Sequence, residues 1–411
     1  MNCVRSNPRE MMQHEAMSIY DTIGVHTIIN AKGTSTRVSG ALLAPEVTAA
    51  MQEAAQYCVD MAEIQAAASK IIAEVTGAEA GIVTSGAAAG LLLGTAACVA
   101  GLDPAKMARL PDTTGMKNEV VMVRSQRNQY DHAIRSAGVH IIEAGLPDRV
   151  AGAGVRDAEP WEIAAAVTER TAAIVYVANA SARPRIEEVA HVANSKYVPL
   201  LVDAAAQLPP AANLRRFLAA GADLVAFSGG KAIGGPQGSG ILCGGRDLIM
   251  SAVLQQLDLD IAWEQWSPPP SLIDKNRLAG LPPHGIGRQC KVGKETIVGL
   301  LVALRRFLAE NEQARHDRLL GLVKRLDSAT GSLRNARTEV RTGGATPRFI
   351  LTLEPGFKMT GMDVCIALQN GTPSIHVDPS QAASGIIGFS PACLRPEDPD
   401  AIGRRLRELI G

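Results

Sequence analysis

A lysine preceded by two glycines is the residue of this sequence best suited to covalent chemistry. It ends the segment Ser228-Gly229-Gly230-Lys231, which follows the short apolar run Leu224–Phe227. Apolar surroundings disfavour the charged form of an amine, so Lys231 can form an imine and act as a base. The glycines allow backbone to approach a phosphate, to which Ser228 can donate a hydrogen bond. The alternative is that Lys231 is a solvated surface lysine without a catalytic role.

Two further segments could bind parts of one ligand together with this lysine. The small residues of Thr84–Gly90 follow an apolar run and open a helical pattern. Free N–H groups and the positive end of a helix dipole favour a phosphate there, although small residues also mark tight helix packing. Asp203 follows the apolar run Leu200–Val202, at the sheet edge where α/β folds bind ligands. Its carboxylate could keep a pyridine nitrogen protonated or could cap a helix.

Two glycine patterns resemble nucleotide-binding motifs without matching them. Gly235-x-x-Gly238-x-Gly240 reverses the dinucleotide fingerprint and precedes an apolar run instead of opening a helix. Gly230-Lys231 lacks the earlier glycine and the following Ser or Thr of a P-loop. The sequence therefore does not favour a nucleotide cofactor.

Composition narrows the possible partners and location. The 41 basic and 41 acidic side chains give a net charge of zero without a basic stripe, so nucleic acid is not expected as a partner. The seven cysteines form no C-x-x-C pair and the eight histidines no metal-binding spacing, so we expect a reducing compartment and no metal. The longest apolar stretch, Ala87–Gly101, is too short to span a membrane, and no signal peptide is evident. We expect a cytoplasmic protein that does not bind a membrane.

Short β-rich runs alternate with helical patterns from residue 80 onward. Several runs lack polar alternation, which is typical of strands buried on both faces of a parallel sheet. The pattern predicts an α/β architecture with a mostly parallel central sheet and helices on both faces. The expected strands are Ala80–Thr84, Val120–Val123, His140–Ile142, Ala172–Val177, Leu200–Val202, Leu224–Phe227 and Ser239–Cys243.

The chain is expected to divide into three parts. Residues 1–40 are predicted to form an N-terminal arm and a glycine-punctuated loop, and residues 41–290 a large cofactor-binding domain. Residues 291–411 should form a linking helix, Lys294 to about Leu308, and a small α+β domain. The small-domain elements expected are strands 349–353, 374–377 and 385–389 and helices 361–369 and 398–409.

Several segments together resemble the selenocysteine-synthase-like family of fold-type-I pyridoxal phosphate (PLP) enzymes. The order of phosphate turn, aspartate and then lysine 28 residues later is the order found in fold-type-I enzymes. The resemblance extends from about Ile28 to the C-terminus and is strongest to the D-glucosaminate-6-phosphate ammonia-lyase branch. It rests on Asn30-Ala31-x-Gly33-Thr34, Thr76–Ala80, Thr84–Ala89, Val202–Ala206, Ser228–Lys231 and Gly287-Arg288-x-x-Lys291-Val292-Gly293-Lys294-Glu295.

The resemblance implies an aspartate-aminotransferase fold, a role for each matched residue and a homodimer or higher homo-oligomer. Lys231 would bind PLP covalently, and Asp203 would pair with the ring nitrogen. The phosphate would be held by Ser85, Gly86, Ala87 and Ser228. The ring-stacking residue should lie in Arg124–His132, where Gln126, Tyr130 and His132 are alternatives.

The substrate side rests on arginines, because a bidentate arginine best binds the α-carboxylate of an amino acid. Arg348 is the first choice and Arg37 the second. Arg288 and Lys291 could bind a distal phosphate or carboxylate. For each, an interdomain or surface ion pair is the alternative.

The branch implies a lyase that acts on an amino acid or amino-sugar acid. Lys231 would remove the Cα proton, a β-substituent would leave, and a 2-oxo acid and ammonia would follow. An aminotransferase, a racemase, a carbon–sulfur lyase and a non-catalytic PLP-fold binding protein are alternatives. Selenium transfer to aminoacyl-tRNA is disfavoured, because only a short arm precedes the cofactor fold and the net charge is zero.

Overall fold

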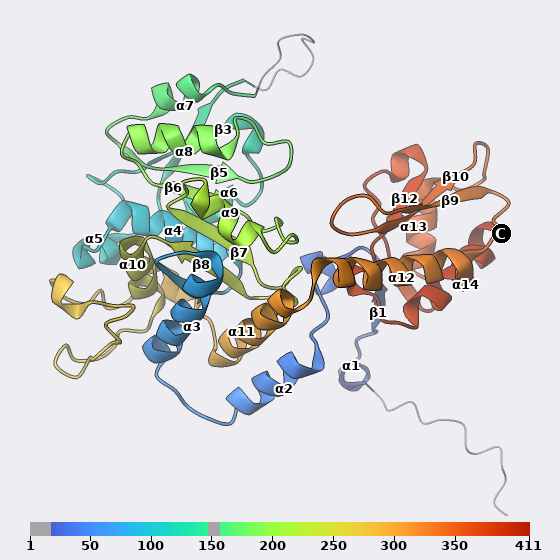
Figure 1. Ribbon diagram of the computed structural model, residues 1–411, viewed down its shortest axis with the longest axis horizontal. Coiled ribbons are helices and arrows are strands. Elements are labelled where there is room, and N and C mark those ends of the chain that lie inside the picture. The colour runs from blue at the N-terminus through green and yellow to red at the C-terminus, as the bar shows by residue number, and fades with distance from the viewer. Residues whose placement is uncertain (1–17, 147–156) are drawn as a thin grey trace, which may run out of the picture. The chain divides into compact units, whose positions relative to one another are not determined.

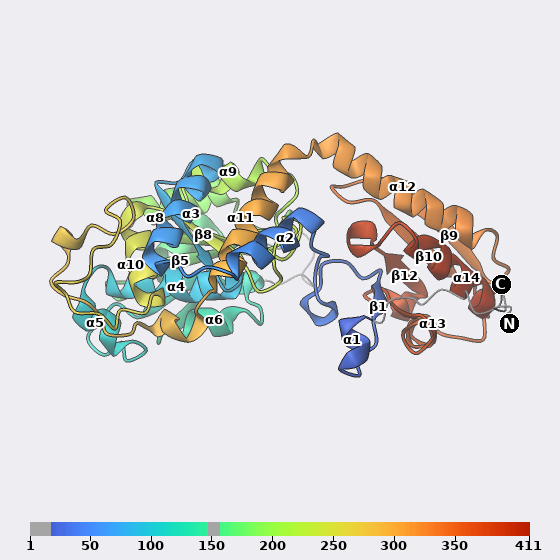
Figure 2. The ribbon, with the colours of Figure 1, turned by 90° about the horizontal axis from the view of Figure 1, so that it is seen from below.

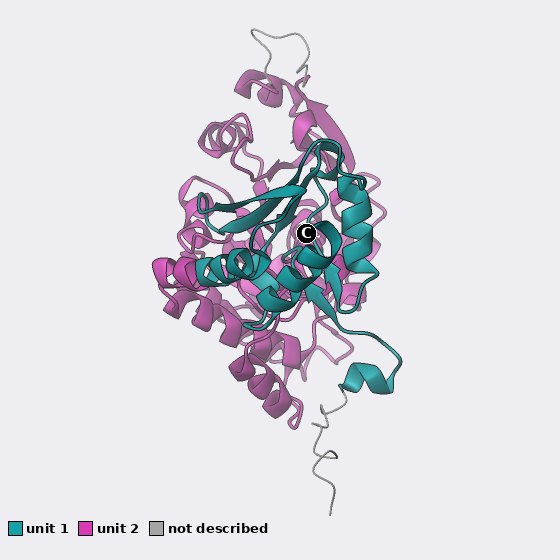
Figure 3. Cartoon of the chain, turned by 90° about the vertical axis from the view of Figure 1, so that its right-hand side faces the viewer, with its two compact units in different colours: residues 1–33, 319–411 teal, residues 34–318 magenta. Residues whose placement is uncertain are grey.

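The computed structural model describes residues 18–146 and 157–411, which fall into two compact units (Figure 3). The larger unit is Thr34–Arg318, and the smaller combines residues up to Gly33 with Leu319–Gly411. These limits differ from the predicted boundaries at residues 40 and 290. Helix α11 (Lys294–Ala309) belongs to the larger unit because it packs against α2 (Pro45–Ala54), and the chain changes unit within α12 (Glu312–Thr330).

The larger unit is built on a seven-stranded sheet with the order β2-β8-β7-β6-β5-β3-β4 (Figure 1). Strand β8 runs antiparallel to both neighbours, and the other pairs are parallel. The predicted mostly parallel sheet is therefore confirmed, and all seven expected runs are strands. Their bounds are β2 Ala80–Thr84, β3 Glu119–Val123, β4 His140–Ala144, β5 Thr171–Val177, β6 Leu200–Asp203, β7 Leu224–Ser228 and β8 Gly240–Gly244.

Both faces of this sheet are buried under helices (Figures 1 and 2). Successive β3 residues alternate between two cores: Val120 packs with α4 and α10, whereas Val121 packs on the opposite face with α3, α8 and α11. This alternation explains why the strands read as continuous apolar runs. The helices are α3 Met61–Thr76, α4 Ala87–Ala100, α5 Pro104–Arg109, α6 Asp131–Arg135, α7 Pro160–Ala166, α8 Ile186–Ser195, α9 Asn213–Ala219 and α10 Arg246–Gln256.

The smaller unit packs its own core under an antiparallel sheet of order β12-β10-β9. Phe349 and Phe389 meet there edge to face, with ring centroids 5.4 Å apart. Strand β9 and helix α12 were not predicted, because both are rich in charged residues and β9 is an edge strand. The elements are α1 Ile19–Thr22, β1 Ile28–Asn30, β9 Ala336–Arg341, β10 Arg348–Leu353, α13 Gly361–Gln369, β11 Ser374–His376, β12 Ile386–Phe389 and α14 Asp398–Ile410.

A membrane-spanning helix needs both sufficient length and sufficient hydropathy. Within the two described ranges, no helix is both long and apolar enough to cross a bilayer.

Candidate active site

The carboxyl ends of four neighbouring strands bring the predicted cofactor residues to one edge of the large sheet. Asp203 is the last residue of β6 and lies in register with Val177 of β5 and Ala226 of β7. Lys231 follows the end of β7, and Gln126 follows the end of β3, the next strand beyond β5. This edge is where parallel α/β sheets bind ligands.

Lys231 and Asp203 are close enough to influence each other's ionisation. Burial lowers the pKa of the Lys231 amine, and the charge of Asp203 opposes this shift. Burial raises the pKa of the Asp203 carboxyl, while the Ala205 N–H group and Lys231 pull it back down. Desolvation therefore dominates at both groups and favours a neutral, nucleophilic amine.

The Asp203 carboxylate is held so that one of its oxygens can serve a ligand. The side chain is only 8% exposed. The Ala205 N–H group donates to Oδ1 at 3.0 Å, and the Ala178 N–H group donates to the Asp203 backbone oxygen at 2.9 Å. Among the described residues the carboxylate forms no other hydrogen bond, so Oδ2 can accept one from a protonated ring nitrogen.

The turn before α4 has the form expected of a phosphate cradle. Gly86 is the N-cap of α4, with φ +93°, a conformation that residues with a side chain rarely adopt. No described atom lies within 4 Å of the position that a Cβ on Gly86 would take. Open space thus adjoins the positive end of a 14-residue helix that is buried except at Ala88 and Cys98, and an anion is stabilised there.

Replacing Gly86 by alanine is expected to weaken PLP binding by about tenfold, because the methyl group would occupy the phosphate space and strain the backbone by about 1–2 kcal/mol. PLP titration followed by absorbance measures the first effect, and thermal unfolding of the apo-protein the second. Gly101→Ala is the matched control, since Gly101 ends the same helix with φ +56° and equally open surroundings. Equal PLP affinity in the two variants would contradict the cradle.

The glycines before Lys231 serve intrachain packing, which differs from the predicted role of admitting a phosphate. A Cβ on Gly229 would lie 2.3 Å from Ser239 Oγ, and one on Gly230 would lie 2.5 Å from the Gln237 Cα. The Gly229 N–H group donates to the Ser239 carbonyl at 2.8 Å. Ser239 and Gln237 therefore fix the conformation of Ser228–Lys231, which we call the lysine turn. A single sequence contains no pattern that predicts either contact.

Two hydroxyls assigned to the phosphate differ in their contacts. Ser85 Oγ donates to the Cys290 carbonyl at 2.8 Å, so its backbone N–H group is the part left for an anion. The hydrogen bond ties the phosphate turn to the short helix η4 (Ile286–Cys290). The Ser228 hydroxyl is half-buried and forms no hydrogen bond within the described ranges, so it can donate to a ligand.

The three candidates for ring stacking are placed very differently. Gln126 is 5% exposed, and its Oε1 accepts from the Val177 N–H group at 2.9 Å. This contact fixes the orientation of the amide and leaves Nε2 buried without a partner in the described chain. Tyr130 is 58% exposed, and the exposed His132 contacts Arg135. Among the three, Gln126 alone combines burial at the site edge with an unused donor.

The three arginines proposed for substrate lie in different surroundings. Exposed Arg37 lies in the 3-10 helix η1 (Thr36–Val38), whose Thr36 carbonyl accepts from Gln237 Nε2 at 2.8 Å, next to the lysine turn. Arg288 forms an ion pair with Asp258 at 2.7 Å. Arg348 belongs to the smaller unit, where it pairs with Asp378 at 3.1 Å. Arg37 and Arg288 thus both belong to the larger unit, in segments that are hydrogen-bonded to Gln237 beside the lysine turn and to the phosphate turn, respectively.

The groups gathered in the larger unit match the parts of PLP. The α4 N-terminus and Ser228 suit its phosphate, Asp203 its ring nitrogen and Lys231 its aldehyde. The open space at Gly86 and the unpartnered Gln126 amide both fit a bound ligand.

Comparisons with known proteins relate this chain to named enzymes. The family model described as SelA, L-seryl-tRNA selenium transferase, matches residues 28–261. A 5'-C-glycyluridine monooxygenase-decarboxylase from Streptomyces sp. is 33% identical over 95% of this chain and 92% of its own. D-glucosaminate-6-phosphate ammonia lyase from Salmonella typhimurium is 28% identical over 95% of this chain and 98% of its own.

Solved structures support the same fold. That of a D-glucosaminate-6-phosphate ammonia-lyase superposes with a TM-score of 0.79 at 28% identity, covering 96% of this chain and 98% of the other. A serine palmitoyltransferase from S. paucimobilis, 13% identical with a TM-score of 0.52, covers 93% of this chain and 87% of its own and shares the fold alone. The predicted fold type I is therefore confirmed.

Proposed function

Since the chain belongs to the SelA, L-seryl-tRNA selenium transferase, family, we propose that it is a PLP-dependent lyase. It acts on an amino acid or amino-sugar acid by Cα deprotonation and β-elimination, which yields a 2-oxo acid and ammonia. The observation that carries the proposal is that buried Asp203, half-buried Lys231 and the open space at Gly86 lie at the same edge of the large sheet, with Asp203 and Lys231 in electrostatic contact. The ammonia-lyase relative, aligned over nearly the whole of both chains, supports the choice of reaction.

Each residue of the site has a defined task in this reaction. When bound, PLP supplies an electron sink for the pair released at Cα. Asp203 Oδ2 would keep the ring nitrogen protonated, and the burial of Asp203 would strengthen this interaction. The α4 N-terminus and Ser228 fix the phosphate. The Lys231 amine would hold PLP through its aldehyde and would be the base that takes the Cα proton of the substrate.

The substrate class follows from what the relatives' names share. Glycyluridine, glucosaminate and seryl-tRNA each contain an amino acid joined to, or built from, a sugar. We propose that this protein's substrate is likewise an α-amino acid carrying a hydroxylated or sugar-like side chain. A β-hydroxyl on such a side chain is the group that leaves.

Arg37 is proposed to bind the substrate carboxylate. Arg37→Gln is expected to raise KM about 10- to 100-fold, because a hydrogen bond between charged groups contributes about 1.5–3 kcal/mol, and to leave the PLP absorbance unchanged. Arg288→Gln and Arg348→Gln are the matched variants. Steady-state kinetics show which arginine binds the carboxylate. If KM rises in Arg288→Gln or Arg348→Gln and not in Arg37→Gln, the carboxylate is bound by that other arginine.

A second candidate is favoured by the Streptomyces relative, which is 33% identical over 407 residues. A reaction of that kind would consume dioxygen and release the substrate carboxylate as carbon dioxide. It needs the same lysine, aspartate and phosphate cradle, so the geometry of these groups suits both reactions.

The products distinguish the two reactions. The PLP-loaded protein is incubated with D- and L-β-hydroxy amino acids, amino-sugar acids with and without a phosphate, and 5'-glycyl nucleosides. The lyase releases equal amounts of 2-oxo acid and ammonia without dioxygen uptake, whereas the alternative consumes dioxygen and forms carbon dioxide. Turnover that requires an added keto acid would identify an aminotransferase. A yellow protein that releases no product from any of them would be a binding protein.

Transfer to a tRNA is not proposed for this chain. The selenium transferase from Hyphomonas neptunium aligns with 54% of this chain and 50% of its own. The zero net charge offers no excess of cations for a polyanion.

A further inference from the structure

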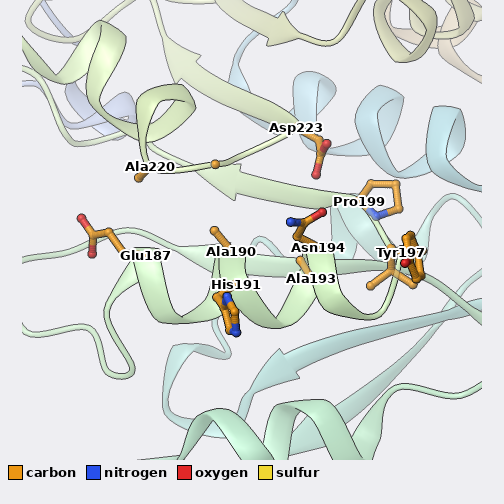
Figure 4. A pocket seen from close by; sticks show the side chains of 11 residues that line it. Glu187, Ala190, His191, Ala193, Asn194, Tyr197, Pro199, Ala220 and Asp223 are labelled. Carbon is orange, nitrogen blue, oxygen red and sulfur yellow. The ribbon is translucent and has the colours of Figure 1, made fainter.

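A hollow opens at the amino edge of the large sheet, opposite the candidate active site (Figure 4). It has a volume of about 570 Å³ and is walled by α8, by the turn that leads into β6, and by residues 220–223 before β7. Strands β6 and β7 begin at this hollow, and their other ends carry Asp203 and the lysine turn. A ligand here would therefore not compete with substrate.

The hollow carries two carboxylates and one imidazole. Glu187, Asp223 and His191 line it, and among the described residues no lysine or arginine does. Neither carboxylate forms an ion pair with any residue that the structure describes. Asp223 keeps an exposed side, yet desolvation by the surrounding protein raises the pKa of its carboxyl. Its Oδ2 accepts from the Leu200 N–H group at 2.7 Å, which holds the carboxylate in place.

The two carboxylates lie toward opposite ends of the hollow. Glu187 and Asn194 are seven residues apart on one face of α8, a rise of about 10 Å. Asn194 points toward Asp223 across the hollow in Figure 4, while Glu187 lies at the far end. The small side chains Ala190 and Ala193 line the helix wall between them. The space is thus elongated, with a carboxylate toward each end and with alanine side chains and His191 along the helix wall between them.

An aromatic ring stands at the Asp223 end. Tyr197 is 91% exposed and adopts φ +53°, a left-handed conformation that glycine or asparagine usually occupies after a helix. The backbone conformation is unfavourable for a tyrosine, and an exposed ring gains little from packing. The C-terminal end of the α8 dipole adds negative potential here. An aromatic face beside a carboxylate attracts organic cations.

We propose that this hollow is a binding site for a linear organic dication, of the size and charge spacing of an aliphatic polyamine. One ammonium group lies between Asp223, Asn194 and Tyr197, the chain crosses Ala190 and Ala193, and the second ammonium group reaches Glu187. An anion is excluded by the two carboxylates. A monocation would pair with only one of the two carboxylates.

The test uses hexamethonium, a bis-quaternary ammonium ion that cannot react with the PLP aldehyde. Calorimetric titration of the PLP-loaded full-length protein at low ionic strength compares it with tetramethylammonium, the monocation. Hexamethonium is expected to bind at least about fivefold more tightly. Glu187→Gln and Asp223→Asn should each weaken its binding about threefold, as expected for exposed charge pairs. Tyr197→Gly should weaken it to a similar degree through loss of the ring.

Matched variants separate the site from general effects. Glu53→Gln removes one exposed acid from α2 and should not change the affinity. Tyr197→Phe should keep the affinity, and Tyr197→Gly should unfold at the same or a higher temperature because its backbone conformation suits glycine. Equal affinity for the two cations, or equal affinity of Glu187→Gln and Glu53→Gln for hexamethonium, would overturn the proposal.

Discussion

Replacing Lys231 by alanine is expected to lower turnover by about 10⁴-fold, since proton transfer by a positioned group typically contributes 10²–10⁴ and the covalent attachment of PLP is lost as well. The absorbance of protein-bound PLP should change with the activity. Borohydride reduction of the wild-type protein followed by peptide mapping should label the peptide that contains Lys231.

Lys70→Ala is the control for this experiment, because Lys70 is an exposed lysine of α3. It should keep the activity and the label. A label on another lysine, or a Lys231→Ala protein with full activity, would remove the basis of the proposed function.

The pH dependence of PLP capture provides a second, independent measure of the same lysine. Because burial lowers the pKa of Lys231, the neutral amine should be populated at a lower pH than for an ordinary lysine. The rate of capture by the apo-protein should therefore rise with pH and level off above that lowered pKa. The charge of Asp203 raises the pKa of the amine, so Asp203→Asn should shift the profile toward lower pH. A shift in the opposite direction would contradict the pairing.

The large sheet could be predicted from the sequence because all its strands except the edge strand β4 are largely buried on both faces. Val120 and Val121 point to opposite cores, so neither face leaves a polar position in the run. Strand β9 could not be found in this way, since its Arg337, Glu339 and Arg341 alternate along an edge strand. The limits of the compact units differ from the predicted domain boundaries because α11 packs against α2, a segment far away in the chain.

The identities of the candidate site residues could be predicted from the sequence, whereas several of their contacts could not. Asp203 and Lys231 were assigned from strand ends, and in the structure each shifts the pKa of the other. The acceptor of the Ser85 hydroxyl lies 205 residues away at Cys290, beyond the reach of any local pattern. The sequence likewise predicted that Gly229 makes room for a phosphate. In the structure, Ser239 occupies the space beside the Gly229 Cα. Tertiary packing alone decides such roles.

Asp203→Asn should separate the cofactor role of this residue from any structural one. Activity is expected to fall by about 10²–10³-fold, the usual loss when a group that stabilises developing charge in a buried site is removed. The apo-protein should unfold at the same or a higher temperature. Asparagine can still accept from the Ala205 N–H group, and it removes a buried carboxylate whose charged form the fold disfavours.

The sign of the stability change follows from the raised pKa of Asp203. A carboxyl that binds its proton more tightly in the folded state stabilises the fold below its unfolded pKa and loses that contribution as the pH rises through the folded value. At neutral pH the wild-type apo-protein therefore carries a penalty that Asp203→Asn lacks, and the difference between the two should vanish in acid. Bound PLP reverses the order, because its protonated ring nitrogen pairs with the carboxylate, so PLP should raise the unfolding temperature more in the wild type than in the variant. If Asp203→Asn instead lowered apo stability at neutral pH and lost activity in proportion, the residue would be a structural cap and not the partner of the ring.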